Sequence, residues 1–166
     1  LVILDQEARQ EYIIKEATRL ASNIGLAIKQ DDNLLEELTG LVEYPQVLIG
    51  TIDSKFLSVP SVVLVSSMKI HQKYFSLIDS SGNFAPYFIF VSNIKSTDEN
   101  TVINGNQKVL SARLSDALYF YKQDLQSSLK SKASKLDNII FHAKIGTLAE
   151  KVKRINSIAH YLYKQL

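Results

Sequence analysis

The sequence has no cysteine, no tryptophan and a single methionine among its 166 residues. Without cysteine there is no disulfide framework, no thiolate nucleophile and none of the common cysteine-based zinc sites. Glycine is also scarce, with six residues. No Gly-x-Gly-x-x-Gly or Walker spacing occurs, so a dedicated phosphate-binding loop is not expected. No apolar run approaches the roughly 20 residues that span a bilayer, and we expect no membrane partner.

The net charge of +2 conceals an uneven distribution along the chain. Residues 1–66 carry five basic and ten acidic side chains, whereas residues 100–166 carry eleven basic and four acidic ones. A C-terminal third this basic can attract a polyanion such as nucleic acid. The alternative, which composition leaves open, is a solvated helical face rich in lysine.

The first 70 residues predict alternating helices and strands. Residues 1–4 have the pattern of a strand entered in mid-course, which suggests an internal segment of a longer chain. Asp5 is expected to cap a helix that ends near Gly25, and Asp31 to open a second helix that ends before Pro45. Short strands are expected at 26–29 and 47–52, and Pro60 is expected to start a helix running to about residue 70.

A hairpin and then helices are expected in the rest of the chain. Residues 73–79 and 87–91 are rich in β-branched and aromatic side chains and flank turn residues, which is typical of an antiparallel hairpin. After a capping cluster at 96–99, apolar spacing predicts helix to about 125, further helix at 129–140, and a last helix whose apolar seam reaches Leu166. The predicted fold is α+β over residues 1–125, followed by a truncated helical domain over 126–166.

No constellation for catalysis or metal binding is found. No Gly-x-Ser-x-Gly elbow or adjacent His-Asp pair occurs. His71 lies beside Lys69 and Lys73 at a predicted helix-to-strand junction, where it can contact a phosphate or simply be a half-buried structural histidine. His142 and His160 have no acidic partner at metal-ligand spacing and are expected to lie in the core or on the surface. We therefore predict no catalytic residue and no metal ligand in this chain.

The basic residues are the remaining candidates for a binding role. Lysine and arginine neutralise phosphates without reading sequence. The predicted RNA-contact residues are Lys69, His71, Lys73, Lys108, Arg113, Lys144, Lys151 and Arg154.

Five stretches, in order and at their spacing, resemble the β subunit of the bacterial heterotetrameric glycyl-tRNA synthetase. The resemblance runs from about Val2 to Ala159, and its second and fourth stretches are the most specific. The stretches are Leu34–Pro45 (LLEELTGLVEYP), Met68–Phe75 (MKIHQKYF), Phe88–Ile94 (FIFVSNI), Gly105–Ala117 (GNQKVLSARLSDA) and Phe141–Leu148 (FHAKIGTL). Gln107 and Ser111 depart from it, since the family usually has a charged residue at the first position and often Arg at the second.

The resemblance implies a cytoplasmic enzyme that joins glycine to tRNA(Gly). Aminoacylation, with its ATP and Mg²⁺, would belong to the separate α subunit, and no cofactor would bind this segment. Residues 1–125 would be the second half of a region similar to the B3/4 module of phenylalanyl-tRNA synthetase, and 126–166 the entry to an HD-type helical domain. The segment would bind tRNA(Gly) and contact the α subunit and the rest of the β subunit.

Two alternatives remain open at this point. The B3/4-like portion is a candidate hydrolase of mischarged tRNA, with His71 assisting a water molecule. Glycine is the smallest amino acid, however, so a tight synthetic pocket rejects larger competitors by steric clash and needs little editing. The other alternative is a pure interaction module whose terminal apolar seam docks on another protein surface.

Overall fold

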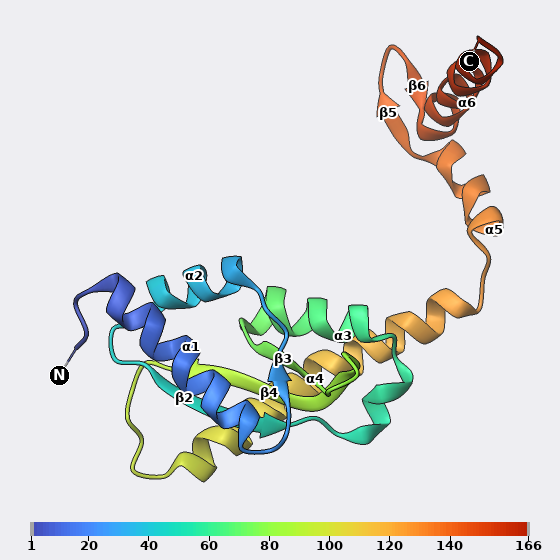
Figure 1. The fold of residues 1–166 in the computed structure, drawn as a ribbon. Coiled ribbons are helices and arrows are strands. Elements are labelled where there is room, and N and C mark those ends of the chain that lie inside the picture. Colours follow the sequence, from blue (N-terminus) through green and yellow to red (C-terminus); the bar gives the residue numbers. More distant parts are fainter. Residues whose placement is uncertain (1, 166) are drawn as a thin grey trace. The chain divides into compact units, whose positions relative to one another are not determined.

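The computed structural model describes residues 2–165 as two compact units. Unit 1 comprises the residues up to Phe120 and unit 2 those from Tyr121 onward. The division falls within one long helix, and each unit is described on its own (Figure 1). The α+β fold class is confirmed. The domain boundary expected after residue 125 stays a prediction, because the division into units reflects only packing.

The two N-terminal helices begin where the sequence indicates. Helix α1 (Gln6–Ser22) follows Asp5, whose side chain accepts the Ala8 N–H at 2.9 Å. Helix α2 (Asp32–Leu41) follows Asp31, which accepts the Leu34 N–H at 3.1 Å. Between them the chain passes through Gly25, whose φ of 71° lies in the left-handed region, and forms the short strand β1 (Ala27–Ile28).

The strand expected at the start of the chain is absent over the described residues 2–4, while Leu1 lies outside them. Only the Ile3 N–H makes a backbone bond there, to the Glu43 carbonyl at 2.8 Å. The carbonyl of Ile3 accepts instead from the Arg9 guanidinium at 2.6 Å. A side chain from α1 therefore anchors this segment, and it joins no ladder.

Four antiparallel strands form the sheet of unit 1, in the order β1-β3-β4-β2. Strand β2 spans Gln46–Thr51, β3 spans Phe75–Ile78 and β4 spans Phe84–Ser92. The predicted hairpin is β3–β4, and its turn is held by Asp79, which accepts the N–H groups of Ser81 and Asn83. The strands predicted at 26–29 and 47–52 are also confirmed to within one or two residues.

The helix expected from Pro60 to about residue 70 is α-helical only over its first part. After a 3₁₀ turn (Ser54–Ser58), α3 covers only Ser61–Ser67 and then widens into a π-helical turn (Met68–Gln72). Lys73, with a φ of 58°, ends the turn in the left-handed region and directs the chain into β3. The long helix α4 (Glu99–Leu125) follows β4 as predicted.

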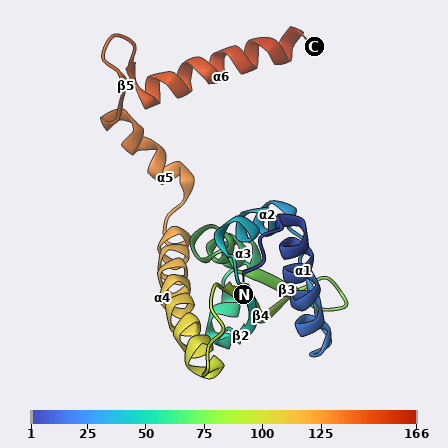
Figure 2. The ribbon, with the colours of Figure 1, turned by 90° about the vertical axis from the view of Figure 1, so that its left-hand side faces the viewer.

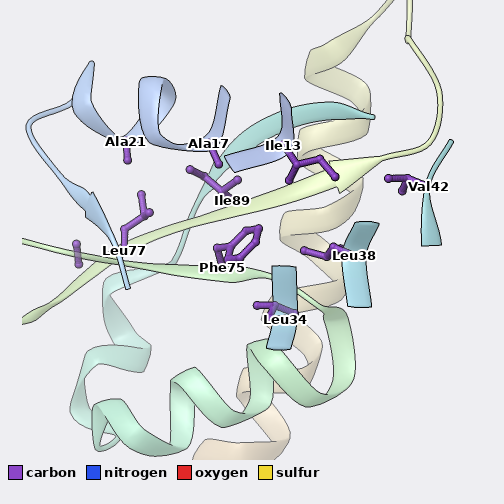
Figure 3. Packing of buried hydrophobic residues seen from close by; sticks show 10 residues of the cluster. Ile13, Ala17, Ala21, Leu34, Leu38, Val42, Phe75, Leu77 and Ile89 are labelled. Carbon is purple, nitrogen blue, oxygen red and sulfur yellow. The ribbon is translucent and has the colours of Figure 1, made fainter. Parts of the chain in front are cut away.

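One core lies between the sheet and helices α1 and α2 (Figure 3). Apolar residues at helical spacing on α1 and α2 meet alternate residues of β3 and β4, as expected for one buried face of each element. The buried members are Ile13, Ala17, Ala21, Leu34, Leu38, Val42, Phe75, Leu77, Ala85 and Ile89.

The other face of the sheet carries an aromatic cluster. The rings of Tyr74 and Phe88 stack with centroids 4.8 Å apart, and Phe90 lies 5.7 Å from Tyr74. The Tyr74 hydroxyl donates to Asn106 Oδ1 at 2.5 Å, which ties α4 to this face, and burial raises the pKa of Tyr74 to about 12. Figure 2 shows the strands with α1 on one side and α4 on the other.

Unit 2 contains a hairpin where helix was expected. The predicted helix at 129–140 is wrong beyond Ala133, because α5 (Leu129–Ala133) gives way to a 3₁₀ turn (Ser134–Asn138) and strand β5 (Ile140–His142). The β-branched and aromatic run at 139–141 and Gly146, with a φ of 90°, favour a hairpin with β6 (Gly146–Thr147). Helix α6 (Leu148–Gln165) follows, and the side chains of its apolar seam, such as Ile155 and Leu162, are each 54% exposed.

Replacement by alanine is expected to change the stability of the chain in opposite directions at two glycines of unit 1. A Cβ on Gly50 in β2 would lie 2.5 Å from the Phe88 ring, so Gly50→Ala should destabilise the chain by about 2 kcal/mol or more. Gly105 in the exposed middle of α4 has nothing within 4 Å of a built Cβ. Gly105→Ala should therefore stabilise it by about 0.5–1 kcal/mol. Urea denaturation of the two variants checks both signs, and equal effects would contradict this packing.

Candidate nucleic-acid interface

The lysines at the α3–β3 junction are tied to helix α2. Lys69 Nζ lies 2.6 Å from Asp31 Oδ2, and Lys73 Nζ lies 2.8 Å from Glu37 Oε1. The two ion pairs connect the π-helical turn and its C-terminal residue Lys73 to the start and the middle of α2. They also neutralise most of the positive charge that the sequence suggested for this region. The geometry thus favours a structural role for both lysines, and their contact with RNA stays a prediction.

Asp31 is held in its ionised form by this arrangement. Its partial burial opposes ionisation, but hydrogen bonds from the Lys69 ammonium and the Leu34 N–H outweigh that effect. The pKa of the Asp31 carboxyl therefore lies below its ordinary value. The Asp31 carboxylate thus caps α2 and, through Lys69, also holds the π-helical turn.

His71 lies exposed on the π-helical turn between these lysines. The small cavity beside the turn, of about 30 Å³, is lined by Lys69, Tyr74 and Phe75 but not by His71. A cavity of that size holds about one water molecule and no aminoacyl ester. Within residues 2–165, no group of three or more His, Asp or Glu side chains is placed to hold a metal ion.

Lys108 and Arg113 are exposed on α4 but do not share a face. Five residues along a helix correspond to a rotation of about 140°, so the two cations point in different directions. Lys108 borders an open polar cavity of about 410 Å³ between α4 and the end of β2. Arg113 is exposed on the same turn as the buried Leu110 and Leu114.

Gln107 has a role that sequence reasoning missed. Its Oε1 accepts the Thr51 N–H at 2.8 Å and the Thr51 hydroxyl at 2.9 Å, so it caps the end of β2. A side chain with an acceptor oxygen is needed there, and a lysine or arginine would leave the Thr51 N–H without that partner. No signal within the helix pattern links Gln107 to a strand 56 residues earlier.

The densest positive charge belongs to unit 2. From Tyr121 to the end, the sequence has nine Lys or Arg and three Asp or Glu residues. Lys144 is exposed in the β5–β6 connection, and Lys151 and Arg154 lie one helical turn apart near the start of α6. These three of the eight candidate residues therefore belong to one compact unit.

The start of α6 is fixed to the hairpin by two contacts. Glu150 Oε2 accepts the Thr147 N–H at 2.8 Å, and the Glu150 N–H donates to Thr147 Oγ1 at 3.3 Å, which is a capping box. Lys151 Nζ lies 3.9 Å from the centre of the Phe141 ring, a cation–π contact between α6 and β5. Lys151 thus stabilises the unit and presents charge, whereas Lys153 and Arg154 are exposed.

No helix among residues 2–165 has both the length and the apolar character needed to cross a membrane.

Comparison with known proteins matches the whole chain to one family. The sequence profile described as "Glycyl-tRNA synthetase beta subunit" matches residues 1–166. The glycine–tRNA ligase beta subunit of Rickettsia canadensis (strain McKiel) is 53% identical over 161 residues, which are 97% of this chain and 24% of the relative. That of Rickettsia felis (strain ATCC VR-1525 / URRWXCal2) is 54% identical over 160 residues, 96% of this chain and 24% of the relative. The chain thus spans about a quarter of the length of the curated relatives it matches.

The Asp31–Lys69 pair predicts a defined pH dependence of stability. Asp31→Asn keeps the helix cap but removes the charge, and should lower the free energy of unfolding by about 0.5–1 kcal/mol at pH 7. Because the folded pKa of Asp31 is depressed, that difference should persist at neutral pH and shrink as the pH falls below about 4. Asp32→Asn, which removes an exposed carboxylate from the same turn, is the control and should cost less. Equal losses in the two variants would contradict a role for the Lys69 pair.

Proposed function

Because the chain belongs to the family of glycyl-tRNA synthetase beta subunits, a component of an aminoacyl-tRNA synthetase, we propose that it helps to hold tRNA(Gly) while the enzyme joins glycine to it. On this proposal the ATP-dependent chemistry and its Mg²⁺ belong to the α subunit, in the cytoplasm. Unit 1 is then a B3/4-like scaffold, and unit 2 the beginning of a helical domain.

The single observation that supports this role most is the contrast between the lysines of the two units. In unit 1, Lys69 and Lys73 are neutralised by carboxylates of α2 at 2.6 and 2.8 Å. In unit 2, Lys153 and Arg154 are exposed on a helix whose start is capped by the Thr147–Glu150 capping box. An exposed basic helix start is suited to phosphate contacts that position an RNA without reading its sequence.

Charge reversal on α6 tests the proposal in the full-length enzyme with its α subunit. The double variant Lys153→Glu, Arg154→Glu should weaken binding of tRNA(Gly) about tenfold. It should also reduce the slope of log affinity against log salt by about 1 for each phosphate that is no longer neutralised. The aminoacylation rate at saturating tRNA should stay unchanged. These two positions are preferred to Lys151, because replacing Lys151 also removes the cation–π interaction with the Phe141 ring.

Lys15→Glu provides the matched control. Lys15 is an exposed cation on α1 of unit 1, so the change in net charge has the same sign without altering α6. Its tRNA affinity should stay within about twofold of the unchanged enzyme. Equal affinities in the double variant and the unchanged enzyme, measured by filter binding at low salt, would refute the proposed contact.

A further inference from the structure

One edge of the unit 1 sheet is open over part of its length, and its strand carries no charged residue, proline or bulge. In the order β1-β3-β4-β2, strand β2 is the last strand that the described residues form. Its sequence, Gln-Val-Leu-Ile-Gly-Thr, holds no charged residue and no proline, and its register with β4 runs without a bulge. Edge strands in native proteins are commonly blunted by one of these devices, because an open edge pairs readily with another strand.

The direction of the unpaired backbone groups follows from two hydrogen bonds. The Ile52 N–H donates to the Pro86 carbonyl, just beyond the β2–β4 ladder. The neighbouring Thr51 N–H points the other way and donates to Gln107. Since successive residues of an antiparallel strand alternate in direction, the N–H and C=O groups of Val47 and Ile49 face outward from the sheet, as those of Thr51 do.

A groove of about 500 Å³ lies along this edge, entirely within unit 1. Residues 46–49 form its floor, α1 lines it with Tyr12 and Leu20, and the start of α4 lines it with Ile103. Arg19 and Lys95 in its lining are matched in number by Glu16 and Glu99, so the groove has no net charge to attract RNA. Its shape and chemistry suit an uncharged extended segment, flanked by one helix on each side.

Side chains bound the open stretch of the β2 edge at both ends. At one end, the outward-facing N–H of Thr51 donates to the Gln107 side chain. At the other end, the Gln46 side chain donates to Glu99 Oε1 at 2.7 Å and accepts the Ser96 N–H at 2.9 Å. Only the stretch around Val47–Ile49 remains open, which leaves room for a strand of about three to five residues.

We propose that this groove receives a short β-strand from another part of the same β subunit, outside residues 1–166. About three quarters of the length of the matched relatives lies outside this segment, so most of the subunit remains to be packed. Ile3 lines the groove, and its N–H donates to the Glu43 carbonyl, so Ile3 is held at this rim. A tethered strand also has an effective concentration in the millimolar range, which favours it over a separate molecule.

Hydrogen exchange in the full-length subunit, bound to its α subunit, gives the first test. The amides of Val47 and Ile49 should exchange on the order of 100-fold more slowly than unprotected amides, as those of Leu48 and Gly50 should because they bond to β4. The Thr51 amide, bonded to Gln107, is an internal reference. Fast exchange at Val47 and Ile49 beside slow exchange at Leu48 and Gly50 would overturn the proposal.

Crosslinking in the same complex identifies the occupant. A p-benzoylphenylalanine placed at position 12 substitutes one exposed ring for another on the groove wall, since Tyr12 is 41% exposed. The expected product joins position 12 to a β-subunit peptide outside residues 1–166. Mixing light and ¹⁵N-labelled subunits separates bonds within one chain from bonds between copies.

Any other product overturns the inference. That includes links to a second β copy, to the α subunit or to tRNA, and links confined to residues 1–166. The same reagent at position 119, where Tyr119 is 58% exposed and does not line the groove, shows what an exposed ring captures elsewhere. The proposed tRNA contacts belong to unit 2, so either idea can fail without the other.

Discussion

Strand β4 is the element on which the rest of unit 1 depends. It is paired on both sides, with β3 and β2, and its residues alternate between two helical layers. Ile89 packs beneath α1 and α2, while Phe88 and Phe90 form the aromatic cluster on the side of α4. The buried Phe88 ring occupies the space above Gly50, so the side chain of one strand fixes what its neighbour can carry. Three successive residues of β4 therefore contribute to the packing on both faces of the sheet.

The fold of unit 1 explains part of the uneven charge distribution along the chain. The acidic excess of the first 66 residues includes Asp31 and Glu37, whose carboxylates neutralise Lys69 and Lys73 and so link α2 to the α3–β3 junction. In unit 2 the basic residues outnumber the acidic ones threefold, and Lys153 and Arg154 stay exposed. A hydrophobic core thus accounts for the fold of unit 1, whereas the exposed basic side chains of unit 2 are the feature from which the tRNA contact is proposed.

Local patterns predicted most of the fold. The caps at Asp5 and Asp31, the β3–β4 hairpin and the long α4 were all visible, because each follows from residues close in sequence. Two local predictions were wrong: the Ile3 carbonyl accepts from the Arg9 guanidinium and residues 2–4 join no strand, and residues 140–147 form a hairpin within a helical pattern. Among the candidate site residues, Lys144, Lys151 and Arg154 belong to a basic C-terminal part that is visible in the sequence alone. The pairing of Lys69 with Asp31 and the capping of β2 by Gln107 depend on residues 38 and 56 positions apart, beyond the reach of any spacing rule.

The most direct test of the account compares the full-length enzyme with and without tRNA(Gly) by hydrogen-exchange mass spectrometry. If unit 2 supplies the RNA contacts, peptides covering the start of α6, around residues 148–157, should exchange more slowly when tRNA is bound. Peptides covering 67–74, whose lysines are held by α2, should be unchanged. Protection of 67–74 with no change at the start of α6 would contradict the account.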